Sequence, residues 1–90
     1  MISIIIINEF DTVKYLEKTV ISIEEKITNI EYEIIIVNMK MPAEDDSRKK
    51  LKVYFLKTDN LAKAKNYGAA KSNYGTLFFL KAGIEIKINP

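Results

Sequence analysis

Short apolar runs alternate with helical patterns along this chain. The runs Ile2–Ile7 and Tyr32–Val37 are almost continuously apolar and β-branched, which is typical of strands buried on both faces. Between them, apolar residues recur at spacings of three and four, which predicts an amphipathic helix over residues 12–28. Asp11 or Thr12 is expected to cap its start with a side-chain oxygen. The apolar stripe of this helix consists of Val13, Leu16, Val20, Ile23 and Ile27.

The second half of the chain repeats the alternation. Strands are predicted over residues 51–57 and 75–80, with a helix over residues 60–72 between them. This helix is rich in small residues, which favour close approach to a sheet. After a turn at Gly83, apolar and polar residues alternate over Ile84–Asn89, a pattern typical of a short fifth strand. The small residues of the second helix are Ala62, Ala64, Gly68, Ala69 and Ala70.

Buried-type strands separated by amphipathic helices predict an α/β fold with a mainly parallel sheet. We expect a single domain over residues 1–90, with three Rossmann-like layers and the strand order 3-2-1-4. In that order, the crevice lies at the carboxyl ends of the first and fourth strands, where the order reverses. The connection over residues 38–48 is long enough for a crossover but carries no strong helix signal.

Composition limits the chemistry that this chain can perform. Its 90 residues contain no cysteine and no histidine, which excludes disulfides, thiolate nucleophiles and the commonest general base and metal ligand. Catalysis would have to use carboxylates, lysines, tyrosines or hydroxyls. The apolar runs are far shorter than the ~20 residues needed to span a bilayer, and no signal-peptide pattern opens the chain. We therefore expect a cytoplasmic location.

Charge is distributed unevenly. Residues 1–47 carry four lysines against ten acidic residues, a balance of −6, whereas residues 48–90 have a balance of +8. This asymmetry is compatible with an anionic ligand near the second half, but a solvated lysine face is the better interpretation. Glu44–Asp46 can be interpreted as a metal cluster, but a solvated acidic loop is the better interpretation because calcium-loop spacing is missing.

Several segments, taken in order, resemble family 2 glycosyltransferases. Ser3–Ile6 followed by Tyr15–Val20 is similar to the opening of that family, and Tyr32–Val37 is similar to its second strand. Asn60–Gly68 resembles its "Gly-Leu-Ala-X-Ala-Arg-Asn-X-Gly" helix, and residues 71–80 resemble the segment that leads to its metal-binding motif. The resemblance implies the nucleotide-binding half of a GT-A fold, which holds a nucleotide-diphospho-sugar at its switch point.

The chain departs from the family at the positions that carry chemistry. Asn38 stands where an aspartate accepts a hydrogen bond from the nucleobase, and it retains a carbonyl that can accept the same bond. Lys81-Ala82-Gly83 replaces the Asp-X-Asp motif, so the resemblance implies neither a divalent metal cofactor nor a catalytic residue here. Lys81 can supply positive charge in place of the metal. The candidate nucleotide-binding residues are Asn8, Glu9, Asn38, Lys63 and Lys81.

These observations favour a glycosyltransferase-like domain that is catalytically inactive and binds a nucleotide or nucleotide-sugar weakly, or serves as a scaffold. An active minimal transferase completed by dimerisation or by a partner chain is the first alternative. A non-enzymatic nucleic-acid-binding protein that uses residues 48–71 is the second. A homodimer is also expected, because an uncovered fourth strand is a template for pairing. The alternating run Ile84–Asn89 would either cap that edge or pair with its counterpart.

Overall fold

The computed structural model describes residues 1–43 and 51–85, and it places one sheet between two helices. All strand pairs are parallel, and the strand order is β3-β2-β1-β4. The predicted α/β fold and the 3-2-1-4 order are therefore confirmed. The elements in chain order are β1 (Ile2–Asn8), α1 (Lys14–Lys26), β2 (Tyr32–Asn38), β3 (Leu51–Phe55), α2 (Leu61–Lys71) and β4 (Thr76–Lys81).

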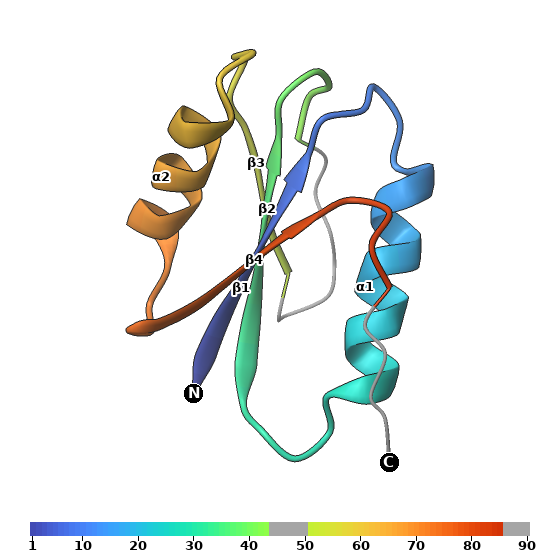
Figure 1. Ribbon diagram of the computed structural model, residues 1–90, viewed down its shortest axis with the longest axis vertical. Coiled ribbons are helices and arrows are strands. Elements are labelled where there is room, and N and C mark those ends of the chain that lie inside the picture. The colour runs from blue at the N-terminus through green and yellow to red at the C-terminus, as the bar shows by residue number, and fades with distance from the viewer. Residues whose placement is uncertain (44–50, 86–90) are drawn as a thin grey trace.

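The two helices cover opposite faces of the sheet, so the molecule has three layers (Figure 1). The central strands β1 and β2 pair in register from Ile2 with Tyr32 to Asn8 with Asn38. Both strands are buried from their second residue onward. Burial on both faces explains their nearly continuous β-branched sequences, because each face must pack against a helix.

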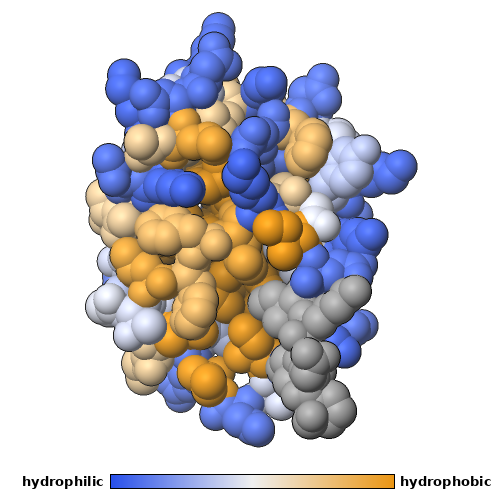
Figure 2. Space-filling view, in the orientation of Figure 1, coloured by the Kyte–Doolittle hydropathy of each residue, from blue (hydrophilic) through white to orange (hydrophobic). Residues whose placement is uncertain are grey.

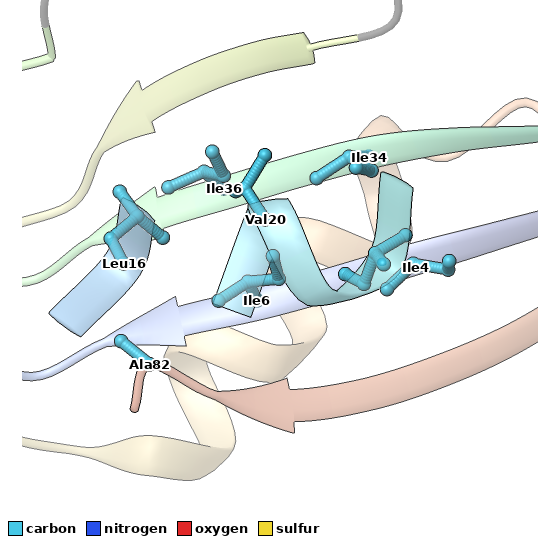
Figure 3. Close-up of a cluster of buried hydrophobic side chains, with 8 residues drawn as sticks. Ile4, Ile6, Leu16, Val20, Ile34, Ile36 and Ala82 are labelled. Atoms are coloured by element: carbon cyan, nitrogen blue, oxygen red, sulfur yellow. The ribbon is translucent and has the colours of Figure 1, made fainter. Parts of the chain in front are cut away.

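The core on the α1 side holds every second side chain of the central strands. Ile4 and Ile6 of β1 meet the helix residues Leu16, Val20 and Ile23 (Figure 3). Each of these side chains is at most 6% exposed. The predicted stripe is confirmed for these three helix residues and for Ile27, which packs against the same core. Val13 differs, because it precedes the helix and is 37% exposed.

The core on the α2 side is thinner because this helix approaches the sheet closely. Ala64 and Gly68 are the buried residues of α2. A Cβ added at Gly68 would lie 2.5 Å from Cγ2 of Ile5 and 3.3 Å from Cγ2 of Val37. Such separations leave no room for a methyl group, so the small residues of α2 set its distance from the sheet.

The start of α1 differs from the sequence-based expectation. The helix begins after Val13, which is its N-cap residue and makes no side-chain cap. Thr12 Oγ1 accepts the N–H of Lys14 at 3.3 Å, so the expected bond from a side-chain oxygen to a free amide is present, although Thr12 is not the N-cap residue. The physical reason is the preceding loop: the Asn8 amide donates to the carbonyl of Thr12 at 3.3 Å, and Asn8 Oδ1 accepts the N–H of Phe10 at 3.2 Å. These bonds hold the chain in a turn, which delays the helix. In contrast, Asn60 caps α2 by accepting the N–H of Lys63 at 3.1 Å.

After β4, the chain turns away from the sheet edge toward α1. Gly83, with φ at +102°, donates its N–H to Thr19 Oγ1 at 2.8 Å and to the Tyr15 carbonyl at 3.1 Å. Glu85 then pairs with Lys18 of α1 at 3.3 Å. Ile84 and Glu85 are not in a strand, and the rest of the expected fifth strand, like the Glu44–Asp46 run, lies outside the described residues.

Within the described residues, no helix combines the length and the apolar character that crossing a membrane requires.

Candidate functional site at the carboxyl ends of β1 and β4

A crevice opens where the strand order reverses, between the carboxyl ends of β1 and β4. β1 leads to α1 on one face of the sheet, whereas β4 arrives from α2 on the other, so the strand order reverses between β1 and β4. The cavity between them has a volume of about 260 Å³. Its lining residues are Ile7, Glu9, Phe10, Lys81 and Ala82.

Two opposite charges face each other in this crevice. Lys81 lies opposite Ile7 in the β1–β4 register, and its Nζ is 3.4 Å from Oε1 of Glu9. That oxygen is buried and accepts no hydrogen bond from the described part of the chain, so the contact is an ion pair without hydrogen-bond geometry. Both side chains remain partly exposed, at 55% for Lys81 and 38% for Glu9. An anion entering the crevice can therefore reach the ammonium group of Lys81.

The aromatic ring of Phe10 lines the crevice, and Tyr15 packs against it. The ring centroids of Phe10 and Tyr15 are 4.4 Å apart, with an angle of 35° between the ring planes. Both side chains are about two-fifths exposed, at 40% and 41%. A partly exposed ring beside a cation offers a surface for a flat, apolar group that carries a negative charge nearby. Phe10 is absent from the residues that the sequence singled out, and the available signal was an aromatic residue directly after a strand end.

Asn8 and Asn38 lie behind the crevice, buried at the ends of the central strands, with 0% and 1% exposure. Asn8 Nδ2 donates to Asn38 Oδ1 at 3.0 Å, and Asn38 Nδ2 donates to the Pro42 carbonyl at 3.4 Å. The Asn38 oxygen that was expected to accept a bond from a nucleobase thus already accepts one from Asn8. In this structure, the two side chains tie together the loops after β1 and β2.

Lys63 is separate from the other candidates. It is an exposed residue in the first turn of α2, and it does not line the crevice. The structure therefore brings Glu9 and Lys81 together, places Asn8 and Asn38 behind them as a buried pair, and leaves Lys63 apart. The nucleotide-binding role of each residue stays a prediction.

The donor set of the crevice does not suit a divalent metal. Glu9 is its single carboxylate, and Lys81 occupies the space beside it. Across residues 1–43 and 51–85, no three acidic residues gather in a way that could hold a metal ion. Hard cations need several oxygen ligands, and the described lining of the crevice supplies one carboxylate.

The basic segment proposed for nucleic acid is only partly described. Lys52 forms an ion pair with Glu33, with its Nζ 3.4 Å from Oε1 of the carboxylate. Tyr54 packs edge-on against Tyr67, with centroids 5.9 Å apart, and the ammonium of Lys71 lies 5.3 Å from each ring centroid. These side chains are engaged with one another, whereas Arg48-Lys49-Lys50 lies outside the described residues.

A second polar cluster surrounds Glu33 near the amino ends of the strands. Its Oε2 accepts bonds from Ser3 Oγ and from the N–H of Asn73, both at 2.6 Å, and Oε1 accepts from Asn73 Nδ2 at 2.9 Å. Burial alone raises the pKa of Glu33, but the bonds from Ser3 and Asn73 and the contact with Lys52 together outweigh it, so the pKa is lowered. This carboxylate joins β1, β2, β3 and the segment before β4, which makes its role structural.

Comparison with known proteins gives structural matches only. No protein-family model matches the chain, and no curated protein matches it. Among solved structures, it is similar to S. aureus TarS, with a TM-score of 0.68 and 20% identity over 92% of this chain and 17% of that chain. It is also similar to TarS 1–349 in complex with UDP, with a TM-score of 0.68 and 18% identity over 92% of this chain and 28% of that chain.

These matches are informative about the fold. Identities below a quarter carry no statement about activity, and the chain spans less than a third of the length of either structure. TarS is a glycosyltransferase, and the shared region covers nearly all of the present chain. The chain therefore shares the fold of the matching region of TarS, which is a Rossmann-like half domain.

Proposed function

We propose that this chain is a glycosyltransferase-like domain that binds a nucleotide or nucleotide-sugar at the β1–β4 crevice and does not catalyse glycosyl transfer on its own. The observation that carries the proposal is the position of Lys81, a partly exposed cation beside a partly exposed aromatic ring at the switch point of the sheet. Open α/β sheets bind ligands at this point. A structure with the same fold was solved in complex with UDP.

The charges of the crevice favour a diphosphate over a neutral ligand. An ammonium group that is partly desolvated binds phosphate oxygens through charge-assisted hydrogen bonds. Glu9 opposes this attraction, because its carboxylate repels the phosphates and competes for Lys81. The balance of the two predicts weak binding, which is consistent with a cavity of about 260 Å³ that is too small to enclose a whole nucleotide-sugar.

The absence of acidic residues at the end of β4 carries the second part of the proposal. Metal-dependent glycosyl transfer needs the charge on the departing diphosphate to be neutralised. In this chain, Lys81-Ala82-Gly83 occupies the segment where the resemblance places the Asp-X-Asp carboxylates. One ammonium group supplies a single positive charge and no Lewis acid, so turnover is not expected.

Isotope-edited NMR tests the proposal with UDP and a UDP-sugar as probes, each with and without Mg²⁺. We expect saturable shifts at the amides of Glu9, Phe10, Lys81 and Ala82, with the same affinity whether or not Mg²⁺ is present. Uridine serves as the control that lacks phosphate, and its binding should be weaker. No shift at these amides up to millimolar UDP would refute binding at the crevice.

Turnover of the UDP-sugar in the same samples separates inactivity from activity. We expect no release of UDP by the purified chain. Release of UDP that rises with protein concentration more steeply than linearly would instead support an active transferase that is completed by a second chain.

A further inference from the structure

The outer edge of β4 is apolar on both faces of the sheet. Phe78 and Phe79 point to opposite faces and are 53% and 41% exposed. Figure 2, which has the orientation of Figure 1, shows hydrophobic side chains gathered down the middle of the molecule, where Figure 1 shows β4. Thr76–Leu80 contains no charged residue and no proline, so it lacks the features that protect exposed strand edges.

Neither helix shields this edge. α2 packs against β1 and β2, and the chain after β4 turns toward α1, where Gly83 bonds to Tyr15 and Thr19. The described residues therefore contain no strand beyond β4. The other edge strand, β3, is shorter and carries Lys52 near its middle, as protected edges commonly do.

One hydrogen bond shows which main-chain groups of β4 face outward. The N–H of Ala82 donates to the carbonyl of Ile7 at 3.0 Å, so Ala82 directs its main-chain groups toward β1. Orientation alternates along a parallel strand. Leu77, Phe79 and Lys81 therefore direct their N–H and C=O groups away from β1. The Lys81 carbonyl accepts the N–H of Ile84 at 3.2 Å, so both groups of Leu77 and Phe79 and the N–H of Lys81 are the ones that a further strand can bind.

We propose that β4 pairs with β4 of a second copy of this chain, antiparallel about a twofold axis that passes beside Phe79. With Phe79 opposite its own counterpart, Leu77 lies opposite Lys81 of the second copy. The two Phe79 residues then exchange both of their main-chain bonds, and the N–H of each Lys81 donates to the carbonyl of the opposite Leu77. Opposed residues share a face. Phe79 thus meets Phe79 on the α2 face, and Phe78 meets Leu80 on the α1 face.

The apolar side chains along the edge of β4 favour a second copy of this chain over other binding partners. A matching strand must place neutral, apolar side chains opposite Phe78 and Phe79, because a charged side chain there would lie against one of the two rings. β4 of a second copy meets this condition in the antiparallel direction. In that direction each Lys81 packs its aliphatic stem beside Leu77, and the two ammonium groups lie at opposite ends of the paired strands.

This inference is independent of the nucleotide proposal, because it uses the edge of β4 rather than the crevice at its carboxyl end. The paired strands would join two four-stranded sheets into one continuous sheet. Such isologous pairing closes on itself, so it produces a dimer and not a filament.

Sedimentation velocity on charged variants of residue 79 tests the pairing. We expect the wild-type chain to sediment with twice the 10.3 kDa mass of one copy as its concentration rises from micromolar to millimolar. Phe79→Lys and Phe79→Glu should each be monomeric, because like charges would oppose each other across the axis, with self-association weakened by roughly tenfold or more. An equimolar mixture of the two variants should restore the dimer.

Ile21→Lys is the matched control, since Ile21 is 49% exposed and belongs to α1 rather than to β4, and the variant should still dimerise. Circular dichroism verifies that each variant is folded. If the charged variants fail to fold, amide hydrogen exchange of the wild type decides the question. Leu77 and Phe79 should exchange more slowly as concentration rises. A monomer at every concentration, a dimer that persists in Phe79→Lys, or a mixture that stays monomeric overturns the proposal.

Discussion

Asn8 and Asn38 are joined side chain to side chain across the carboxyl ends of the two central strands, with Asn8 Nδ2 donating to Asn38 Oδ1 at 3.0 Å. Both are fully buried. Each also bonds to the loop that follows its own strand: Asn8 to Thr12 and Phe10, and Asn38 to Pro42. The pair therefore holds the loop with Glu9 and Phe10 in place beside the crevice.

Replacing Asn38 by alanine should destabilise the protein by about 1–3 kcal/mol, because the amide of Asn8 loses its buried acceptor. Urea denaturation followed by circular dichroism measures the free energy of unfolding. Asn29→Ala is the control at an exposed position and should change stability by less than about 0.5 kcal/mol. Equal stability of Asn38→Ala and the wild type would show that the buried pair contributes little.

Gly68→Ala should destabilise the protein by up to about 2 kcal/mol, as measured by urea denaturation. The added methyl group would meet Ile5 Cγ2 at 2.5 Å, and overpacking of this kind costs about 1–3 kcal/mol, which exceeds the gain in helix propensity of about 1 kcal/mol. Gly75→Ala is a matched control, because an added Cβ there has no atom within 4 Å. A stabilised Gly68→Ala would mean that α2 can move away from the sheet at little cost.

Much of the fold could be predicted because it depends on patterns along the chain. Continuous apolar runs such as Ile4–Ile7 identify strands buried on both faces, and their alternation with helices determines a parallel sheet. The ends of the elements were harder to predict, as at the start of α1. There the side chain of Asn8 bonds to Thr12 and Phe10, and a local capping rule takes no account of a residue buried in the preceding strand.

The site was less predictable because it depends on contacts between distant residues. The family resemblance directed attention to Asn38 and Lys81, and the strand order brings Lys81 to Glu9. That Asn38 would bond to Asn8 requires knowing the β1–β2 register. Glu33 was missed altogether, because an acidic residue in an apolar strand gives no indication that Ser3 and Asn73 will bond to it.

Glu33→Gln should lower stability at neutral pH by about 1–3 kcal/mol, because the buried carboxylate loses its charge-assisted bonds. The pKa of Glu33 is lowered in the folded protein, so the charged carboxylate stabilises the fold above the ordinary glutamate pKa of about 4.3. This contribution is lost as pH falls from that value through the lowered one. The difference between the wild type and Glu33→Gln should therefore shrink toward acid pH.

Urea denaturation at a series of pH values measures this difference. Glu31→Gln, at an exposed neighbouring position, provides the reference for removing one acidic charge from the same strand end. A gap between the wild type and Glu33→Gln that widens toward acid pH would contradict the assignment of a lowered pKa.

The opposed charges of the crevice make the proposed nucleotide binding testable in both directions. Lys81→Met should weaken UDP binding by roughly tenfold, because a single charge-assisted bond to phosphate is lost. Glu9→Gln should strengthen binding by several-fold, since it removes the carboxylate that repels phosphate and competes for Lys81. Calorimetry or NMR titration measures both dissociation constants. Neither variant should change the affinity for uridine strongly.

Lys65→Met, at an exposed position on α2, controls for a general loss of positive charge. If Lys81→Met and Lys65→Met weaken UDP binding equally, the nucleotide is attracted by the basic half of the chain as a whole and not by the crevice.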